Sequence, residues 1–363
     1  MTLRIIQVGL GVRGKQWAKV IAATPGVRTV AYVARRLDVL RHEAGQLGQA
    51  DVCCFTALPA ALAAVPADVV LLVSPPEVHH EQALAAASAG CHLLIEKPLA
   101  EDWDEAMDIV RQAECHKVQL TVGMNFRYLP THQEIRRIVR AGDYGQPSFG
   151  QFTYIRNRDG HRPDLNKYPL TMDQPMLLEQ SIHHLDLMRY CYDDEVESVL
   201  AETWNPAWSV YQDDSCVSVL LHFRSGLRVN YLGTWTAGWN KFDFRWRTDF
   251  PGGVLIQKKQ FSDLYAARLD PALAMTGPLF KDEAESLLPI ALPQAEHFID
   301  DTRLLLTRFV EAIQAGKPVE TSGKDHLKSL ALVHAIIESA EQGKRVALAD
   351  FYARRGLATG WLE

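Results

Sequence analysis

The chain has 363 residues, of which 47% are hydrophobic and 23% charged. This length favours two domains, because single domains usually contain about 100–200 residues, and the composition excludes wholesale disorder. The 38 Lys and Arg residues against 44 Asp and Glu residues give a formal net charge of −6. Since no global cationic field would hold nucleic acid or an anionic membrane, we expect neither as a partner.

The cysteines and the N-terminus indicate a cytoplasmic protein. Six cysteines without a Cys-x-x-Cys pair or zinc-finger spacing are typical of reduced thiols rather than of a disulfide scaffold. The first apolar run, residues 3–8, is too short for a signal peptide. No stretch approaches the roughly 18 apolar residues of a membrane span.

The first 123 residues alternate between short apolar runs and segments of helical length. Buried parallel strands are predicted at 3–8, 28–33, 51–55, 69–73, 91–95 and 119–122. Helices are predicted between them, from apolar residues spaced three or four apart, at 15–23, 38–47, 79–89 and 103–114. This alternation predicts an α/β domain, a doubly wound parallel sheet covered by helices on both faces, over residues 1–123.

After residue 124 the pattern changes. Helices are predicted at 131–141, 176–191, 295–315 and 325–341, and strands at 148–155, 196–203, 215–223, 227–235 and 242–247. Consecutive strands without helices between them predict an antiparallel or mixed sheet, and hence a second, α+β domain over residues 124–363. The segment 156–174 is a polar loop, and the tryptophan-bearing stretch 235–246 is interpreted as sheet core or subunit contact.

A glycine-rich motif directly follows the first predicted strand and opens a predicted helix: Gly9-Leu10-Gly11-Val12-Arg13-Gly14. In this context the three glycines would serve a tight turn, close backbone approach to a pyrophosphate, and close packing of helix on strand. The helix N-terminus then offers free N–H groups and a partial positive charge to phosphates. The motif predicts a dinucleotide site.

Arg35 and Arg36 follow the second strand, where NAD-binding proteins normally carry an Asp or Glu. An acid would repel the 2′-phosphate of NADP, whereas Arg can bind it through charge-assisted hydrogen bonds. We therefore favour NADP over NAD. The alternative is that both arginines are solvated charges at a helix cap.

Two further motifs follow the third and fourth long strands: Ser74-Pro75-Pro76-Glu77-Val78-His79 and Glu96-Lys97-Pro98. Open α/β sheets bind ligands at the carboxyl ends of their strands. Lys97 in that position can lie beside a nicotinamide and donate to a substrate oxygen. Pro98 indicates a rigid turn of the kind that a cis peptide bond makes, although an isolated Glu-Lys-Pro also fits a surface turn.

Glu179, His183 and Asp186 stand at positions i, i+4 and i+7 of the predicted helix 176–191, and so share one face. An imidazole between two carboxylates suits general acid–base chemistry, with one acid orienting the base. A satisfied network on the helix surface is the alternative.

No metal is expected. The adjacent pairs His79-His80 and His183-His184 would point about 100° apart on a helix, and there is no His-Glu-x-x-His. A nucleophile elbow and a phosphate-binding Gly-x-x-x-x-Gly-Lys loop are also absent from the sequence, which removes the usual signatures of hydrolases and phosphoryl transferases.

Taken in order, these motifs resemble those of the Gfo/Idh/MocA family of NAD(P)-dependent oxidoreductases over nearly the whole chain. The ordered set also includes His183-x-x-Asp186, Gly123-Met124-Asn125-Phe126-Arg127-Tyr128 and Thr321-Ser322-Gly323-Lys324-Asp325. The resemblance implies an N-terminal Rossmann domain, a C-terminal domain with an open, mainly antiparallel sheet, and a homo-oligomer, either dimer or tetramer. It also implies hydride transfer between nicotinamide and a carbinol or carbonyl carbon of a sugar, cyclitol or related polyol.

The resemblance also assigns roles to residues. Lys97 matches the family lysine that stabilises charge on the reacting oxygen, and His183 the acid–base histidine, held by Asp186 or Glu179. Glu179 stands where many members have Asp. Arg127, Arg156 and the loop 156–174 are expected to contact substrate hydroxyls. The cofactor is expected to contact Gly9, Gly11, Val12, Arg13, Gly14, Arg35, Arg36, Ser74, Pro75, His79, Glu96 and Lys97.

Two alternative functions stay open. One is a non-catalytic regulator that senses a dinucleotide, a role that some family members have; the presence of both Lys97 and His183 argues against it. The other is a non-sugar dehydrogenase of the dihydrodiol or biliverdin-reductase type. The polar loop 156–174 favours a polyhydroxy substrate over that second alternative.

Overall fold

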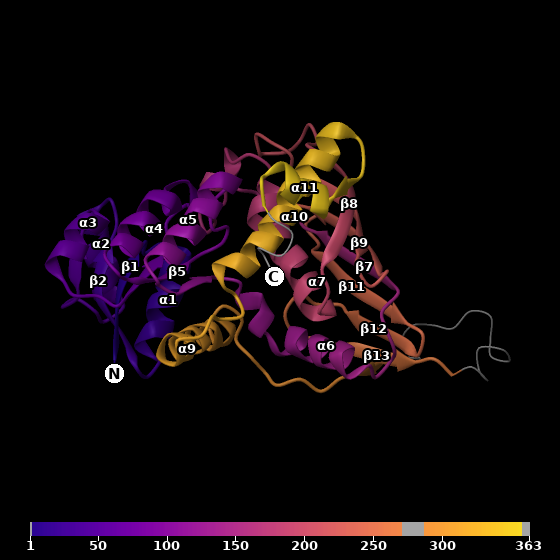
Figure 1. Ribbon diagram of the computed structural model, residues 1–363, viewed down its shortest axis with the longest axis horizontal. Helices are drawn as coiled ribbons and strands as arrows, with labels where there is room; N and C mark the ends of the chain where they lie inside the picture. Colours follow the sequence, from indigo (N-terminus) through magenta and orange to yellow (C-terminus); the bar gives the residue numbers. More distant parts are fainter. Residues whose placement is uncertain (1, 271–286, 358–363) are drawn as a thin grey trace.

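The computed structural model describes residues 2–270 and 287–357, which form two sheets, each with its own helices (Figure 1). The first sheet has six strands in the order β3-β2-β1-β4-β5-β6, and all neighbouring pairs are parallel. The strands are β1 (Leu3–Val8), β2 (Val27–Val33), β3 (Cys53–Phe55), β4 (Val69–Leu72), β5 (His92–Ile95) and β6 (Leu120–Val122). This is the Rossmann strand order, so the predicted parallel sheet is confirmed.

Five helices connect these strands: α1 (Val12–Ala22), α2 (Leu37–Gln46), α3 (Leu58–Ala64), α4 (His79–Ser88) and α5 (Trp103–Cys115). Four of them were predicted, with ends that differ from the observed ones by no more than three residues. Helix α3 was not predicted, because its seven residues, LPAALAA, are apolar all round and therefore show no helical period.

The second sheet has nine strands in the described part of the chain, in the order β14-β13-β12-β11-β7-β10-β9-β8-β15. They are β7 (Phe149–Ile155), β8 (Val196–Trp204), β9 (Cys216–Phe223), β10 (Arg228–Thr234), β11 (Asp243–Phe250), β12 (Gly253–Gln257), β13 (Tyr265–Arg268), β14 (Leu288–Pro289) and β15 (Val346–Ala347). Only β7 and β10 pair in parallel. The predicted, mainly antiparallel second sheet is confirmed, but its short outer strands β12 to β15 were not predicted.

One face of the second sheet is covered by helices, and along its central strands buried and exposed residues alternate. The covering helices are α6 (Pro130–Ala141), α7 (Ile182–Tyr192), α10 (Gly323–Gln342) and α11 (Leu348–Arg354). No helix in residues 2–270 and 287–357 is long and apolar enough to cross a membrane.

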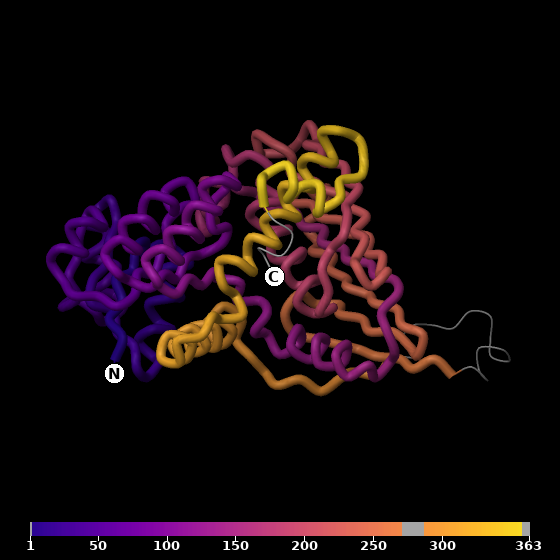
Figure 2. The backbone as a smooth tube through the Cα atoms, viewed as in Figure 1, coloured from indigo at the N-terminus to yellow at the C-terminus, as the bar shows by residue number. Residues whose placement is uncertain are grey.

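Helix α9 (Asp300–Ala315) lies on the first sheet although it belongs to the C-terminal part of the chain (Figure 1). Its Leu305, Leu306 and Phe309 pack in one cluster with Ile5 and Trp17. The chain between β14 and α9 crosses from the second sheet to the first as an extended segment (Figure 2). A domain boundary at residue 123 stays our prediction, with α9 as a helix that returns across it.

Candidate active site

A cleft of about 580 Å³ lies between the two sheets and their helices. Residues that follow β1, β4 and β5 line one side of it, at the point where the strand order of the first sheet reverses. Open α/β sheets bind ligands at such reversals. The opposite side of the cleft carries Glu179 and Gln180 from the segment that leads into α7, and His183 from the first turn of α7.

The glycine-rich motif lines this cleft and fits a dinucleotide. A Cβ atom on Gly9, whose φ is +94°, would lie 2.5 Å from the carbonyl oxygen of Val73, and one on Gly14 would lie 2.4 Å from that of Gly9. A Cβ on Gly11 would meet nothing within 4 Å. Two glycines therefore allow strand, turn and helix to pack closely, while Gly11 leaves the space beside the N-terminus of α1 open for a pyrophosphate.

Arg13 and Glu96 line the cleft as expected, but their charged groups bind each other. The Arg13 Nε donates to Glu96 Oε1 at 2.7 Å, and Trp17 Nε1 donates to the same oxygen at 2.6 Å. Burial opposes ionisation of Glu96, but the charge of Arg13 and these hydrogen bonds outweigh it and lower the pKa of the carboxyl group. Arg13 also donates to Thr302 Oγ1 at 3.0 Å, which ties the glycine-rich turn to α9.

The two arginines after β2 differ in position. Arg35 lines the cleft, whereas Arg36 stands at the N-cap of α2 and does not line it. Both side chains are exposed, and within the described residues neither has an acidic partner. The guanidinium of Arg35 is therefore available to an anion in the cleft.

His79, which was expected to bind the cofactor, is instead a buried link between two loops. Its ring nitrogens lie 2.9 Å from the carbonyl oxygen of Ser74 and 3.1 Å from that of Pro98. Burial lowers the pKa of His79 despite these hydrogen bonds. Ser74 and Pro75 do line the cleft. His79 therefore contributes to the cleft indirectly, by holding the loop that carries these two residues.

Lys97 reaches across the cleft to Glu179. Its Nζ donates to Glu179 Oε2 at 2.6 Å and to the carbonyl oxygen of the same residue at 2.8 Å. The Lys97–Pro98 peptide bond is cis, as the sequence suggested. Both side chains are only slightly exposed, at 11% and 14%, so the ion pair is largely removed from water and more strongly coupled than a surface pair.

The predicted helix 176–191 begins with a π-helical turn, Met176–Ser181, before α7 starts at Ile182. Glu179 and His183 face the cleft, but Asp186 does not. Residues three apart on an α-helix point roughly 60° apart, and here that rotation turns Asp186 away from the cleft toward α10. The expected row of three acid–base residues is therefore a pair.

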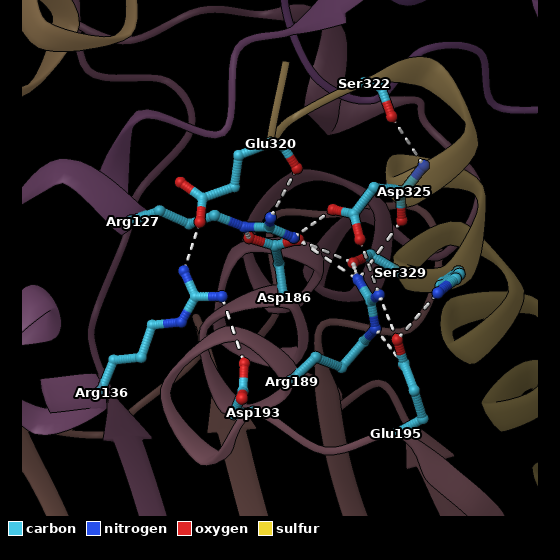
Figure 3. A network of polar contacts seen from close by, with 11 residues as sticks. Arg127, Arg136, Asp186, Arg189, Asp193, Glu195, Glu320, Ser322, Asp325 and Ser329 are labelled. Atoms are coloured by element: carbon cyan, nitrogen blue, oxygen red, sulfur yellow. Dashed lines mark hydrogen bonds and ion pairs between the residues drawn. The ribbon is translucent and has the colours of Figure 1, made fainter. Parts of the chain in front are cut away.

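Asp186 binds Arg127 instead of the imidazole (Figure 3). Its two carboxylate oxygens accept from Arg127 Nε at 2.7 Å and Nη2 at 2.5 Å, and Ser329 Oγ donates to it at 2.8 Å. Arg127 is 3% exposed and does not line the cleft. Burial opposes its charge, but Asp186 and Asp325 together raise the pKa of Arg127. The expected substrate contact of Arg127 is therefore wrong, because its donors are used in this network.

His183 has no carboxylate partner in the described structure. Its Nδ1 is buried without a hydrogen-bond partner among the described residues, and the ring stacks on Phe126 with centroids 4.2 Å apart and planes 24° apart. Burial, and then the charge of Lys97, hold the pKa of His183 well below its usual range. The expectation that Asp186 or Glu179 holds the imidazole is wrong, because both carboxylates bind cations.

The polar loop 156–174 contributes Asn166 and Tyr168 to the cleft, whereas Arg156 does not line it. Burial, and then the charge of Glu179, raise the pKa of Tyr168 well above its usual range, so its hydroxyl is a hydrogen-bond donor. Neither Tyr168 nor Phe298 was predicted as a site residue; Phe298 lines the cleft from the segment before α9. No local pattern around residue 298 indicates a site.

Within residues 2–270 and 287–357 there is no group of three or more His, Cys, Asp or Glu side chains that could hold a metal ion.

Comparison with known proteins identifies both parts of the chain. A model of an oxidoreductase family with an NAD-binding Rossmann fold, GFO/IDH/MocA, matches residues 3–124, and a model of the GFO/IDH/MocA C-terminal domain matches residues 132–253. The chain is 31% identical to an inositol 2-dehydrogenase of Mycolicibacterium smegmatis over 211 residues, 56% of this chain and 57% of that protein. It is 24% identical to an inositol 2-dehydrogenase of Rhizobium meliloti over 352 residues, 96% of this chain and 100% of that protein.

Among solved structures, an oxidoreductase from Agrobacterium radiobacter in complex with NAD+, L-tartaric acid and magnesium has a TM-score of 0.82 at 19% identity. The match covers 96% of this chain and 99% of that one, and it shows that the two share a fold.

Proposed function

The chain belongs to the GFO/IDH/MocA family of oxidoreductases, and we propose that it is an NAD(P)-dependent dehydrogenase acting on a CH–OH carbon of a sugar, cyclitol or related polyol. One observation carries this proposal: Lys97, Glu179 and His183 converge in the same cleft as the glycine-rich motif. The two inositol 2-dehydrogenases among its relatives support a polyhydroxy substrate.

His183 is the proposed acid–base residue. The nicotinamide, when bound, accepts or supplies the hydride at its ring. Because Nδ1 of His183 is buried, Nε2 is the atom that takes the hydroxyl proton during oxidation and returns it during reduction. The lowered pKa of His183 keeps the imidazole neutral near pH 7, which is the form that a base requires.

Lys97 acts on the same substrate oxygen, and Glu179 acts through Lys97. The ammonium of Lys97 stabilises negative charge that develops on the substrate oxygen, and Glu179 orients the ammonium through their ion pair. The carboxylate of Glu179 and the hydroxyl of Tyr168 are further partners for neighbouring substrate hydroxyls. Arg156, which does not line the cleft, has no support from the geometry for its expected contact with the substrate.

We further propose that the cofactor is NADP rather than NAD. The proposal is supported by Arg35, an exposed guanidinium at the cleft without an acidic partner among the described residues. Charge-assisted hydrogen bonds to a 2′-phosphate contribute about 1.5–3 kcal/mol each. No carboxylate stands at the end of β2 to bind the unmodified ribose.

A cytoplasmic homo-oligomer is also part of the proposal. Trp208 and Trp239 are 69% and 71% exposed, and large exposed aromatic side chains are typical of protein interfaces. Size-exclusion chromatography with light scattering would test it, and a monomer at micromolar concentration would refute it.

The function is tested by turnover. The purified chain is mixed with NADP+ or NAD+ and a panel of inositols and aldoses, and cofactor reduction is followed by absorbance. We expect reduction with at least one polyol and its loss in His183→Ala. Tight cofactor binding without turnover on any polyol would instead favour the dinucleotide-sensing regulator. Turnover restricted to dihydrodiols or tetrapyrroles would favour the non-sugar dehydrogenase.

A further inference from the structure

We infer that Phe126 is a positioning residue for His183, in the place where a carboxylate was expected. The inference rests on the proposed function, since it concerns how the proposed acid–base residue is held. Phe126 and His183 are both buried, with exposed fractions of 4% and 6%, and their rings stack at 4.2 Å. A flat ring against the imidazole restricts its rotation and excludes water from that face.

The stack is held by an ion pair between Arg127, the residue after Phe126, and Asp186, one helical turn after His183. Phe126 precedes Arg127 in the turn Asn125–Tyr128, and His183 lies three residues before Asp186 on α7. The bidentate contact of Arg127 with Asp186 joins the turn to the helix, and a bidentate pair defines orientation as well as distance. Figure 3 shows that Arg127 lies between Asp186 and Asp325, so the turn is held by two helices, α7 and α10.

Phe126 is supported from behind by two further rings. Phe261 lies 5.0 Å from it at an edge-to-face angle of 65°, and Phe298 lies 5.7 Å from it. Phe298 has φ of +66°, a left-handed conformation that is rare for a bulky residue and that marks functional sites when the surroundings impose it. Arg13 Nη1 donates to the carbonyl oxygen of Phe298 at 3.3 Å. The segment before α9 thus places the ring of Phe298 in the cleft, next to Phe126.

This arrangement favours the neutral imidazole. No acceptor among the described residues faces Nδ1, so a positive charge on the ring would be poorly solvated. The nearby charged or titratable groups, from five different segments, are Arg13, Lys97, Glu179, His184 and His326. Removing the Phe126 ring would admit water to the imidazole and raise the pKa of His183 toward its ordinary value, because less desolvation opposes the charged form.

The test compares Phe126→Leu with Phe152→Leu in the full chain, on a polyol that the wild type oxidises. Phe152 is the matched control, since it packs on the neighbouring His184 with ring centroids 4.7 Å apart. We expect Phe126→Leu to lower kcat by about 10- to 100-fold, the effect of a misplaced catalytic group, with KM nearly unchanged. The acid limb of its pH–rate profile should move to higher pH, and Phe126→Tyr, which keeps the stack, should restore both.

A further variant keeps the inference testable if Phe126→Leu does not fold. Phe298→Asn tolerates a positive φ but lacks the supporting ring, and we expect it to shift kcat and the acid limb in the same direction by a smaller amount. If the folded variants keep the wild-type kcat and pH profile while His183→Ala is inactive, the inferred role of Phe126 is overturned and the proposed function is not. Full activity of His183→Ala would overturn the proposed function itself.

Discussion

Lys97 and Glu179 come from opposite sides of the cleft and form an ion pair with Nζ 2.6 Å from Oε2. Lys97 follows the β5 strand of the first sheet, and Glu179 lies in the π-helical turn before α7. The pair therefore joins the side of the cleft formed by the first sheet to the side formed by the segment before α7. Because the ammonium of Lys97 binds the carboxylate of Glu179, the length of the side chain at position 179 sets where that ammonium lies.

Glu179→Ala should lower kcat/KM by about 10- to 100-fold, because the ammonium of Lys97 loses the partner that orients it in a site with little water. Steady-state kinetics with the best polyol would measure this. Glu43→Ala is the control, since it breaks a more exposed pair with Lys15 at 2.9 Å. Equal effects of the two substitutions on kcat/KM would contradict the role of Glu179.

Arg35→Ala should weaken NADP binding by about 10- to 100-fold, the effect of losing one charge-assisted hydrogen bond to the 2′-phosphate. NAD binding should change little, and isothermal titration with both cofactors would show the difference. Arg36→Ala should have the smaller effect, because Arg36 does not line the cleft. Tighter binding of NAD than of NADP by the wild type would refute the assignment.

Arg127→Met should destabilise the fold by about 3–5 kcal/mol, because it removes the bidentate partner of the buried Asp186 carboxylate and leaves only the more distant guanidinium of Arg189, at 3.6 Å. Denaturant unfolding would measure the loss. Arg137→Met removes an exposed pair with Glu134 at 2.9 Å and should cost no more than about 1 kcal/mol. A loss of similar size in both variants would mean that the buried network does not stabilise the chain.

Acid should destabilise the protein through two buried histidines, His132 and His326, and a half-buried one, His334. Burial lowers the pKa values of His132, His326 and His334 to about 4. The unfolded chain binds protons at these groups below its ordinary pKa of about 6.5 while the folded chain does not, so stability is full above that pH and falls toward pH 4. At pH 5, each of these histidines should lower the free energy of unfolding by about 2 kcal/mol relative to its value at neutral pH.

The histidine effect is checked by unfolding at pH 7.5 and pH 5. His334→Gln, which cannot titrate, should reduce the difference in stability between the two conditions. His161→Gln, at an exposed position, should leave that difference unchanged. An identical pH dependence in wild type and His334→Gln would contradict the prediction.

The sequence by itself determined the parallel sheet, the glycine-rich turn and the cleft residues Lys97, Glu179 and His183. These features depend on short-range patterns: apolar runs, a motif placed between a strand and a helix, and residues at the ends of strands. The family resemblance is carried by the same local motifs. Their order along the chain sufficed to predict the two-sheet architecture, apart from α3 and the short strands β12 to β15, which have no clear period.

Only the tertiary structure decided which charges and rings meet. Arg13 and Glu96 are 83 residues apart, and Arg127 and Asp186 are 59 apart. A carboxylate pairs with whichever cation packing brings within reach, because an unpaired buried charge is costly. Asp186 therefore binds Arg127 rather than His183, and His183 stacks on Phe126. Phe298 reaches the cleft only because α9 returns to pack on the first sheet, a contact that local sequence cannot encode.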